Sequence, residues 1–276
     1  MTAQKSGLVV IGAGGMGPAI SQRLGSANRI FLADYSERVL DATARSLRES
    51  GYDVETHIID VCHYDSVRRF AQHAAANSRL MTVINTAGIS HAMGNARRVY
   101  EINLVGNANV LDAFVELLPP GSSFTTTASI AGHIRDFPQN LQKHLAEAPR
   151  DQLLQHEGLE IDGDSGYAYE VAKRGVILRV QAVLGQERGK GVRINVVSPG
   201  ITATPMIETE LASPEGDGIR QMINMTPVGT RAGTTHEIAN AFAFLAGPES
   251  SFVNGADIVV DGGCLAVVRA RRLAAM

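Results

Sequence analysis

Short apolar runs alternate with longer stretches of helical periodicity along almost the whole chain. The short runs are bounded by polar or turn-forming residues, which is typical of buried strands. Between them, apolar residues recur every three or four positions, as on one face of a helix. The predicted strands are Leu8–Ile11, Ile30–Ala33, Glu55–Ile59, Leu80–Ile84, Ser123–Thr127, Arg193–Val197 and Ile258–Val260, and the predicted helices are Ser36–Glu49, Ser66–Ala76, Arg97–Leu117, Ala168–Glu187 and Thr235–Leu245.

This alternation favours the α/β class, with a doubly wound, seven-stranded parallel sheet and helices on both of its faces. No internal repeat, low-complexity tract or long Pro/Ser linker interrupts the pattern. The strand predicted at Ile258–Val260 comes so late that the last quarter of the chain is expected to complete the same sheet. We therefore expect a single domain over residues 1–276.

Composition excludes several classes of protein. Hydrophobic residues make up 45% of the chain, charged residues 19%, and the net charge is −3, which disfavours a disordered chain, a nucleic-acid-binding surface and a polybasic membrane patch. The apolar run Leu8–Ile20 has 13 residues with four glycines, short of the roughly 18 apolar residues of a membrane span. Lys5 before this run gives a superficial likeness to a signal peptide, but no small-residue cleavage pattern follows. Cys62 and Cys264 are isolated, so a reducing cytoplasm is expected.

A glycine-rich turn follows the first predicted strand. The spacing Gly12-x-Gly14-x-x-Gly17 before a helix that starts near Pro18 is the dinucleotide-binding fingerprint of Rossmann-type domains. Gly12 permits the tight turn, Gly14 lets the backbone approach a pyrophosphate, and Gly17 allows close packing of helix on strand. The helix N-terminus then offers free N–H groups to the phosphates. The alternative is a glycine-rich turn that binds no ligand.

An acidic residue, Asp34, ends the second predicted strand. A carboxylate there can accept hydrogen bonds from both hydroxyls of an adenosine ribose and would repel a 2′-phosphate, which favours NAD over NADP. The alternative role is an N-cap for the helix that starts near Ser36. Arg38 could meet a 2′-phosphate, but we interpret it as a solvated helical side chain.

Tyr169 and Lys173 lie four residues apart, on one face of a predicted helix. A nearby ammonium stabilises a phenolate and lowers its pKa, which is normally about 10. Tyr169 is therefore a candidate general acid/base near neutral pH. Tyr167 has Val171 in the corresponding position, so we expect it to pack.

Taken together, the motifs resemble the short-chain dehydrogenase/reductase family over nearly the whole chain. No single motif is decisive, but their order and spacing are specific. The set is Gly12-x-Gly14-x-x-Gly17, Asp34, Asp60-Val61, Asn85-Thr86-Ala87-Gly88, Asn103, Ser129, Tyr169-x-x-x-Lys173, Ser198-Pro199-Gly200 and Val260-Asp261-Gly262-Gly263.

The resemblance implies an NAD(H)-dependent oxidoreductase that interconverts a secondary alcohol and a ketone. It implies a catalytic tetrad of Asn103, Ser129, Tyr169 and Lys173. Tyr169 would exchange the proton with the substrate oxygen, which Ser129 would stabilise. Lys173 would lower the pKa of Tyr169 and bind the nicotinamide ribose, and Asn103 would hold a water in a proton relay.

The resemblance also implies how the cofactor is held. Asp60 and Val61 would meet the adenine, the stretch after the fourth strand would line the adenosine side, and Thr204 would bind the carboxamide. The implied cofactor-contacting residues are Gly12, Gly14, Gly15, Met16, Gly17, Asp34, Asp60, Val61, Asn85, Ala87, Gly88, Tyr169, Lys173, Pro199, Gly200, Thr202 and Thr204.

Three departures from the family pattern stand out. The family's glycine turn has one more residue and a Thr before the first Gly, where this chain has Ile11. Thr86 replaces the second Asn of the usual Asn-Asn-Ala-Gly. Ser129 and Tyr169 lie 40 residues apart, where the family commonly has little more than a dozen residues between them.

The additional segment, residues 133–165, contains two helical candidates, Pro138–Ala148 and a second one that begins at Pro149. Because the segment leaves just after Ser129 and returns just before Tyr169, we expect it near the active site, as a substrate lid or a subunit contact. The alternative is an inert surface embellishment. Four of its leucines need an apolar surface to cover: Leu141, Leu145, Leu153 and Leu154.

The insertion and the ending Asp261–Val267 resemble the bacterial 3α-hydroxysteroid dehydrogenase/carbonyl reductase branch, so a hydroxysteroid or another cyclic carbonyl compound is an expected substrate. The alternatives are a 3-ketoacyl or sugar ketoreductase and a non-catalytic dinucleotide-binding regulator. The family implies a homotetramer or homodimer. We expect no metal, because His156-Glu157 is followed by Glu160 where a zinc-protease motif needs a second His.

Overall fold

Strands and helices alternate along the chain, as the hydrophobic pattern predicts. The computed structural model describes residues 5–185 and 190–274. Within those ranges each strand is followed by at least one helix before the next strand begins. The strands are β1 (Ser6–Ile11), β2 (Arg29–Asp34), β3 (Asp53–Ile58), β4 (Arg79–Asn85), β5 (Ser123–Thr127), β6 (Arg193–Pro199) and β7 (Asp257–Val260).

The α-helices vary in length from a single turn to five turns. Short 3₁₀ segments lie at η1 (His91–Met93), η3 (Ile130–His133) and η4 (Pro248–Ser250), and a π-helical turn lies at η2 (Glu101–Val105). The α-helices are α1 (Gly17–Leu24), α2 (Glu37–Glu49), α3 (Tyr64–Asn77), α4 (Ala96–Tyr100), α5 (Gly106–Val115), α6 (Gln139–Glu147), α7 (Ser165–Val183), α8 (Pro205–Ala212), α9 (Gly216–Asn224), α10 (Thr235–Ala246) and α11 (Cys264–Ala274).

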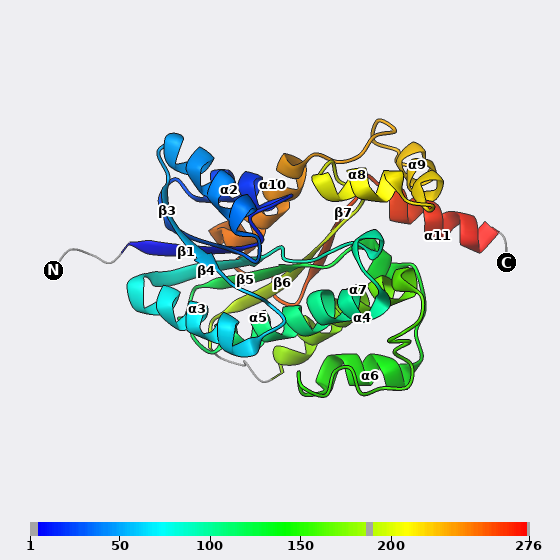
Figure 1. The fold of residues 1–276 in the computed structure, drawn as a ribbon, viewed down its shortest axis with the longest axis horizontal. Helices are drawn as coiled ribbons and strands as arrows, with labels where there is room; N and C mark the ends of the chain where they lie inside the picture. Colours follow the sequence, from blue (N-terminus) through cyan, green and yellow to red (C-terminus); the bar gives the residue numbers. More distant parts are fainter. Residues whose placement is uncertain (1–4, 186–189, 275–276) are drawn as a thin grey trace.

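All the described strands join one parallel sheet in the order β3-β2-β1-β4-β5-β6-β7. Figure 1 shows α2 and α10 on one side of this sheet and α3, α5 and α7 on the other. The predicted doubly wound α/β fold is therefore confirmed. Because the strand order reverses between β1 and β4, the connections from these two strands run to opposite faces and leave a crevice at their carboxyl ends.

The strands read as continuous apolar runs because helices cover both faces of the sheet. On β1, Leu8 and Val10 pack among side chains of α1, α2 and α10. Their neighbours Val9 and Ile11 point the other way, into a cluster with α3, α5 and α7. All four side chains are fully buried. Strand periodicity of two thus divides one apolar run between two cores.

Most predicted elements match the structure to within two or three residues. The helix predicted over Arg97–Leu117 is interrupted, because α4 passes through the π-helical η2 before α5 begins. The helix predicted over Ala168–Glu187 ends earlier, at Val183, and the last two residues of that prediction lie outside the described residues.

The second helix predicted in the insertion, from Pro149, is wrong. The chain instead makes successive turns, in which the Gln152 N–H donates to the Pro149 carbonyl and the Gln155 N–H donates to the Gln152 carbonyl, both at 2.9 Å. The Leu153 carbonyl oxygen, which would accept a backbone N–H in a helix, is paired with a side chain here. His144 Nε2 lies 3.0 Å from it. Leu153 itself is fully buried in this turned segment.

The insertion packs against α7 and α4 within the same chain. Leu141, Leu145 and Leu153 join one buried cluster with side chains of α4 and α7, and Leu154 is partly buried there. Arg179 of α7 donates to the Ala148 carbonyl at 2.8 Å. Figure 1 places α6 outside α7 and α4, on the side away from the sheet. The apolar surface that the leucines need is therefore supplied largely by α7.

Hydropathy along the described helices gives no membrane span: none of them is both long and apolar enough to cross a bilayer.

We expect Leu145→Ala to lower the free energy of unfolding by about 2–5 kcal/mol, because it removes a fully buried side chain from the contact between α6 and α7. Urea unfolding followed by far-UV circular dichroism measures this change. Leu273→Ala is the control, since that side chain is 74% exposed and its loss should alter stability by no more than about 0.5 kcal/mol. Equal effects of the two substitutions would contradict the packing described for α6.

Candidate active site

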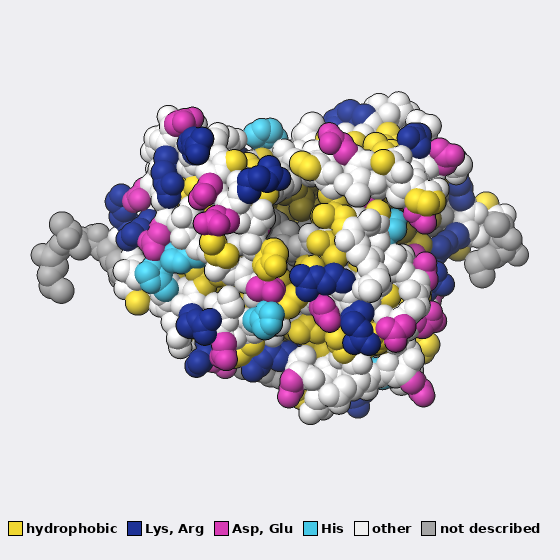
Figure 2. All heavy atoms as spheres, in the orientation of Figure 1, with side chains coloured by type: hydrophobic (Ala, Val, Ile, Leu, Met, Phe, Trp, Pro, Cys, Tyr) yellow, Lys and Arg dark blue, Asp and Glu magenta, His cyan; other side chains and the backbone are white. Residues whose placement is uncertain are grey.

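A cavity of about 1040 Å³ lies beyond the carboxyl ends of the strands. Its wall includes the glycine turn, the end of β2, the segments after β3, β4 and β5, part of α7 and the stretch after β6. Figure 2 shows it as a hollow near the centre of the molecule, with hydrophobic side chains along part of its wall. This is the crevice that the reversal of strand order predicts.

The glycine turn lies at the end of β1 in the conformation that its spacing predicts. Gly12 has a φ of +99°, and a Cβ there would lie 2.5 Å from Oγ1 of Thr86. A Cβ on Gly17 would lie 1.9 Å from the carbonyl oxygen of Gly12, so only glycine lets α1 approach the strand so closely. At Gly14 the nearest atom to an added Cβ is 3.6 Å away, which leaves space for a ligand beside the backbone.

Thr86 explains how a shortened glycine turn keeps its shape. Its Oγ1 lies 3.0 Å from the Ile11 carbonyl oxygen and 3.2 Å from that of Gly12. Its backbone N–H donates to the Ile11 carbonyl at 2.7 Å. Two departures from the family pattern, at Ile11 and Thr86, are therefore in direct contact.

Asp34 supports the turn from the opposite side. Its Oδ2 accepts a hydrogen bond from the Ala13 N–H at 2.7 Å, and its Oδ1 accepts one from the Ser36 N–H at 2.8 Å. The N-cap of α2 is Ser36, so Asp34 is not the cap of that helix. Its carboxylate lines the cavity, where it can reach a ribose.

Asp60 and Val61 line the cavity after β3. Burial acts to raise the pKa of Asp60, but hydrogen bonds from Cys62 and His63 outweigh burial and hold the pKa below its usual value. The Cys62 N–H donates to Asp60 Oδ1 at 2.9 Å, and His63 Nδ1 lies 3.0 Å from Oδ2. Asp60 is thus an ionised group held in one orientation beside the cavity.

Lys173 is deeply buried on α7, with 4% of its surface exposed. Its Nζ lies 5.4 Å from the centre of the Tyr169 ring and donates to the Thr127 carbonyl at 3.4 Å. Burial lowers the pKa of Lys173 to about 8. Lys173 therefore lies near Tyr169, as the sequence predicts, but burial disfavours its protonated form.

Tyr169 has a pKa raised to about 12, because burial and the carboxylate of Glu210 disfavour its phenolate, while a hydrogen bond with Ser129 acts in the opposite direction. The sequence predicts that Lys173 lowers the pKa of Tyr169, and this effect of Lys173 stays a prediction. The sequence pattern did not reveal the opposing effects of burial and of the Glu210 carboxylate.

Asn103 and Ser129 have different positions relative to the cavity. Asn103 lies on the π-helical η2 and is buried, with Oδ1 accepting from the Ile89 N–H at 3.1 Å and Nδ2 donating to the Ile89 carbonyl at 3.0 Å. It therefore holds the loop after β4 and does not line the cavity. Ser129 lines the cavity and accepts from the Ala131 N–H at 3.1 Å.

Two family models match the chain. The model described as short chain dehydrogenase matches residues 6–139, and the model described as enoyl-(acyl carrier protein) reductase matches residues 157–264. Short-chain dehydrogenase/reductase bsc3 of Alternaria brassicicola is 34% identical over 265 residues, which cover 95% of this chain and 96% of that protein. The chain belongs to the short-chain dehydrogenase/reductase family.

Other relatives agree with this family. The 3-alpha-hydroxysteroid dehydrogenase/carbonyl reductase of Comamonas testosteroni is 33% identical over 178 residues, 62% of this chain and 67% of that protein, which supports the predicted resemblance to that branch. A solved structure of actinorhodin polyketide ketoreductase with NADPH has a TM-score of 0.73 at 21% identity and covers 94% of this chain and 97% of its own. This dehydrogenase/reductase is therefore an oxidoreductase of a family that binds a nicotinamide dinucleotide.

Most residues predicted to contact the cofactor line the cavity, but Asn85 and Gly17 do not. Asn85 is buried, accepts from the Ala87 N–H at 3.2 Å and donates to Thr126 Oγ1 at 3.3 Å. Gly17 instead allows α1 to pack closely against the glycine turn, because a Cβ there would lie 1.9 Å from the Gly12 carbonyl oxygen. The predicted residues on the cavity wall are Gly12, Gly14, Gly15, Met16, Asp34, Asp60, Val61, Ala87, Gly88, Ser129, Tyr169, Lys173, Pro199, Gly200, Thr202 and Thr204.

The sequence analysis missed a second wall of the cavity, which α8 and α9 supply. Glu210 of α8 is buried there, and burial raises its pKa, with His91 and Ser90 acting in the opposite direction. The His91 ring centre lies 6.2 Å from that of Tyr169. The signal for α8 is Pro205 at the first helical turn, before an apolar pair. The apolar lining residues of this wall are Met206, Ile207, Ile219 and Met222.

The insertion contributes little to the cavity. Of residues 133–165, Ile134 lies on the cavity wall, and the middle of the segment packs against α7 and α4. Residues of α8 and α9 line the cavity instead. The expected subunit contact stays a prediction.

We expect Glu210→Gln to lower the pKa of Tyr169 below that of the wild type, because it removes a carboxylate that disfavours the phenolate. Tyrosine labelled with ¹³C at Cζ, followed by NMR over alkaline pH, measures this directly. Glu208→Gln is the matched control, since Glu208 lies on the same helix but is exposed. An unchanged Tyr169 titration in Glu210→Gln would show that the two groups do not interact.

Proposed function

We propose that this protein is an NAD(H)-dependent oxidoreductase that interconverts a secondary alcohol and a ketone, with Tyr169 as the general acid/base. The observation that carries the proposal is the layout of one cavity. The glycine turn and Asp34 lie on its wall together with Ser129, Tyr169 and Lys173. The glycine turn and Asp34 would hold a dinucleotide in this cavity, whose wall also carries the Tyr169 phenol.

The residues of this chain fit the cofactor. The space beside Gly14 and the N-terminus of α1 suit a pyrophosphate, and Asp34 suits the adenosine ribose. Lys173 would bind the nicotinamide ribose. When bound, NAD(H) accepts or donates the hydride, and the protein supplies orientation and electrostatics.

The proton would pass through Tyr169. In ketone reduction its hydroxyl donates a proton to the substrate oxygen, while Ser129 stabilises the charge that develops there. In alcohol oxidation Tyr169 must act as a base, and its pKa of about 12 means that positive charge beside it is needed. The Lys173 ammonium is the charge that this chain provides.

Asp34 supports NAD over NADP, because its carboxylate would repel a 2′-phosphate. Arg38 also lines the cavity and is the residue that favours the alternative. NADP binding would require its guanidinium to offset the charge of Asp34. We propose NAD as the cofactor because Asp34 lies at the end of β2.

The wall formed by α8 and α9 favours a substrate with an apolar body. Met206, Ile207 and Met222 line it, which suits a hydroxysteroid or another cyclic carbonyl compound. A 3-ketoacyl or sugar ketoreductase is the alternative enzyme. A non-catalytic regulator is disfavoured, because a regulator has no need of a buried phenol and ammonium. We also propose a homodimer or homotetramer in a reducing cytoplasm, where both free cysteines would persist.

Tyr169→Phe should lower kcat about 10³-fold, because it removes the proton donor, and it should leave NADH affinity nearly unchanged. The measurement is NADH oxidation with a panel of steroid ketones, acyl thioesters and small cyclic ketones, together with NADH binding by fluorescence. Tyr167→Phe is the matched control, since Tyr167 lies on the same helix and its hydroxyl donates to the Gly158 carbonyl at 3.1 Å.

Turnover close to the wild type in a folded Tyr169→Phe enzyme would overturn the role of Tyr169. The absence of turnover with every ketone in wild-type protein that binds NADH would favour the regulator.

Asp34→Ser should weaken NADH binding by about 1–3 kcal/mol, because it removes a charge-assisted hydrogen bond to the ribose. NADPH binding should fall less or improve, and binding titrations with both cofactors measure the difference. Because Asp34 also holds the Ala13 N–H, an equal loss for the two cofactors would mean that its role is to support the glycine turn. A preference for NADPH in the wild type would contradict the assignment of NAD.

A further inference from the structure

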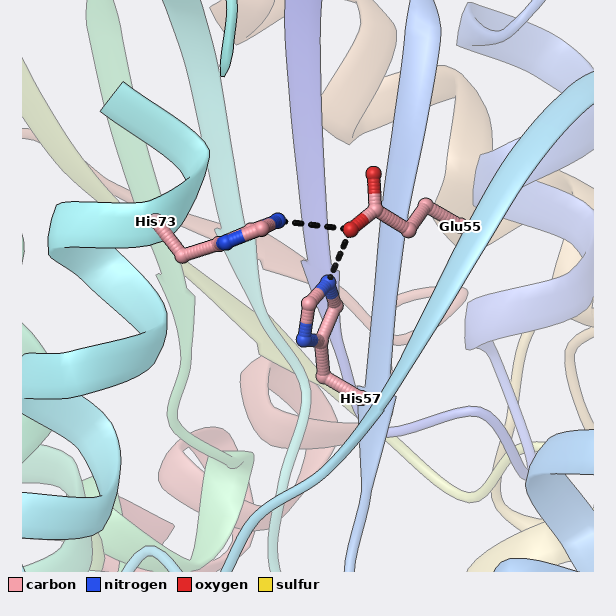
Figure 3. A group of neighbouring side chains, drawn as sticks. All are labelled: Glu55, His57 and His73. Carbon is pink, nitrogen blue, oxygen red and sulfur yellow. Dashed lines mark hydrogen bonds and ion pairs between the residues drawn. The ribbon is translucent and has the colours of Figure 1, made fainter. Parts of the chain in front are cut away.

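Two histidines and a glutamate meet on the outer part of the sheet, away from the cavity wall. β3 is an edge strand, and Glu55 and His57 are two residues apart on it, so their side chains share one face. His73 comes from α3, which packs over that face. Figure 3 shows the three side chains pointing toward one another. None of the three lines the cavity.

The three side chains converge on one carboxylate oxygen. Glu55 Oε1 lies 3.0 Å from His57 Nε2 and 2.6 Å from His73 Nε2. One ligand atom from each residue lies within 4.8 Å of the other two. Both imidazoles therefore present the same ring nitrogen to a common point, as histidines around a metal ion do.

The neighbours of the cluster hold these groups in place. Arg29 Nη2 donates to the other oxygen, Glu55 Oε2, at 2.7 Å. The guanidinium thus orients the carboxylate without occupying Oε1, in the manner of an outer-shell partner. The His57 ring centre lies 4.8 Å from that of Phe70 and 4.8 Å from that of His73, so packing restricts the rotation of both imidazoles.

We propose that Glu55, His57 and His73 form a binding site for one divalent transition-metal cation of the zinc type. Two imidazole nitrogens and one carboxylate oxygen are a ligand set that Zn²⁺ accepts, with water in the fourth position. Mg²⁺ and Ca²⁺ prefer oxygen ligands. The side chain of His73 is 43% exposed, which leaves a path for the ion and room for the water.

The side chains must shift to admit the ion. Ligand atoms about 2.0–2.1 Å from a tetrahedral Zn²⁺ lie roughly 3.3 Å from one another. The two nitrogen-to-oxygen distances of 3.0 and 2.6 Å would open by several tenths of an ångström, and the two imidazole nitrogens, which lie within 4.8 Å of each other, would settle at the same separation. The bound ion would replace the hydrogen bonds from the two imidazoles to Oε1 and would tie β3 to α3.

No sequence motif marks this site, because its ligands come from two elements that only the fold brings together. The spacing Glu55-x-His57 is short, and His73 follows 16 residues later on another element. The expectation of no metal was derived from sequence motifs alone, and this cluster lies outside them.

Isothermal titration with ZnCl₂ tests the proposal on tag-free protein dialysed against a chelator. We expect one Zn²⁺ per chain and an increase in the thermal midpoint, since the ion binds the folded state. Losing an outer-shell partner usually weakens metal binding by about 10–100-fold. Because Glu55, His57 and His73 would bind the ion directly, His57→Ala, His73→Ala and Glu55→Gln should each weaken Zn²⁺ binding by more than this. Mg²⁺ at the same concentration should not bind.

His156→Ala is the matched control, because His156 belongs to another histidine pair, whose ring centres lie 4.9 Å apart. This variant should keep wild-type affinity. Substitution with Co²⁺ should give the intense visible absorption of a four-coordinate ion, which the His57→Ala and His73→Ala proteins should lack. Far-UV circular dichroism confirms that each variant folds, and His57→Gln and His73→Gln replace any alanine variant that does not.

Three results would each overturn the proposal. They are the absence of saturable Zn²⁺ binding to the wild type, equal affinity in the folded His57 and His73 variants, and a faint Co²⁺ spectrum typical of six-coordinate water ligands.

Discussion

The glycine turn after β1 is held from both sides, and the geometry of the whole cavity depends on this. Thr86, at the end of β4, lies against the carbonyl groups of Ile11 and Gly12, while Asp34, at the end of β2, accepts from the Ala13 N–H. These contacts join three adjacent parallel strands at the edge where their order reverses. Side-chain hydrogen bonds from two neighbouring strands therefore help to hold the turn.

Burial disfavours charge on Lys173, Tyr169 and Glu210, which all lie on the cavity wall. Burial makes the ammonium a weaker partner and the phenol a weaker acid than exposed residues would be. A positively charged ligand ring beside them would stabilise the Tyr169 phenolate but would further disfavour the Lys173 ammonium, because like charges repel. The proposed role of Tyr169 as a base is therefore linked to an occupied cofactor site. The same reasoning explains why a helical Tyr and Lys four residues apart do not by themselves produce a reactive phenolate.

The insertion between β5 and α7 packs against the helix that carries Tyr169 and Lys173. Leu145 and Leu153 cover the outer side of α7, and Arg179 donates to the Ala148 carbonyl. Apolar side chains of α8 and α9 line the cavity instead. Position in the chain therefore identified where the insertion begins and ends, but packing decided which side of α7 it covers.

The sequence by itself determined the α/β class, the strands, most helices and the family, because apolar periodicity and the spacing of glycines are local properties. It also placed Asp34 and Ser129 at strand ends and Tyr169 and Lys173 on one helical face. All four residues line the cavity in the structure. Only the tertiary structure decided the pKa of Tyr169, the wall with Glu210, the turns after Pro149 and the meeting of Glu55, His57 and His73. Each of these depends on side chains from distant elements and on how deeply they are buried, and neither contact nor burial is encoded in the spacing of residues along the chain.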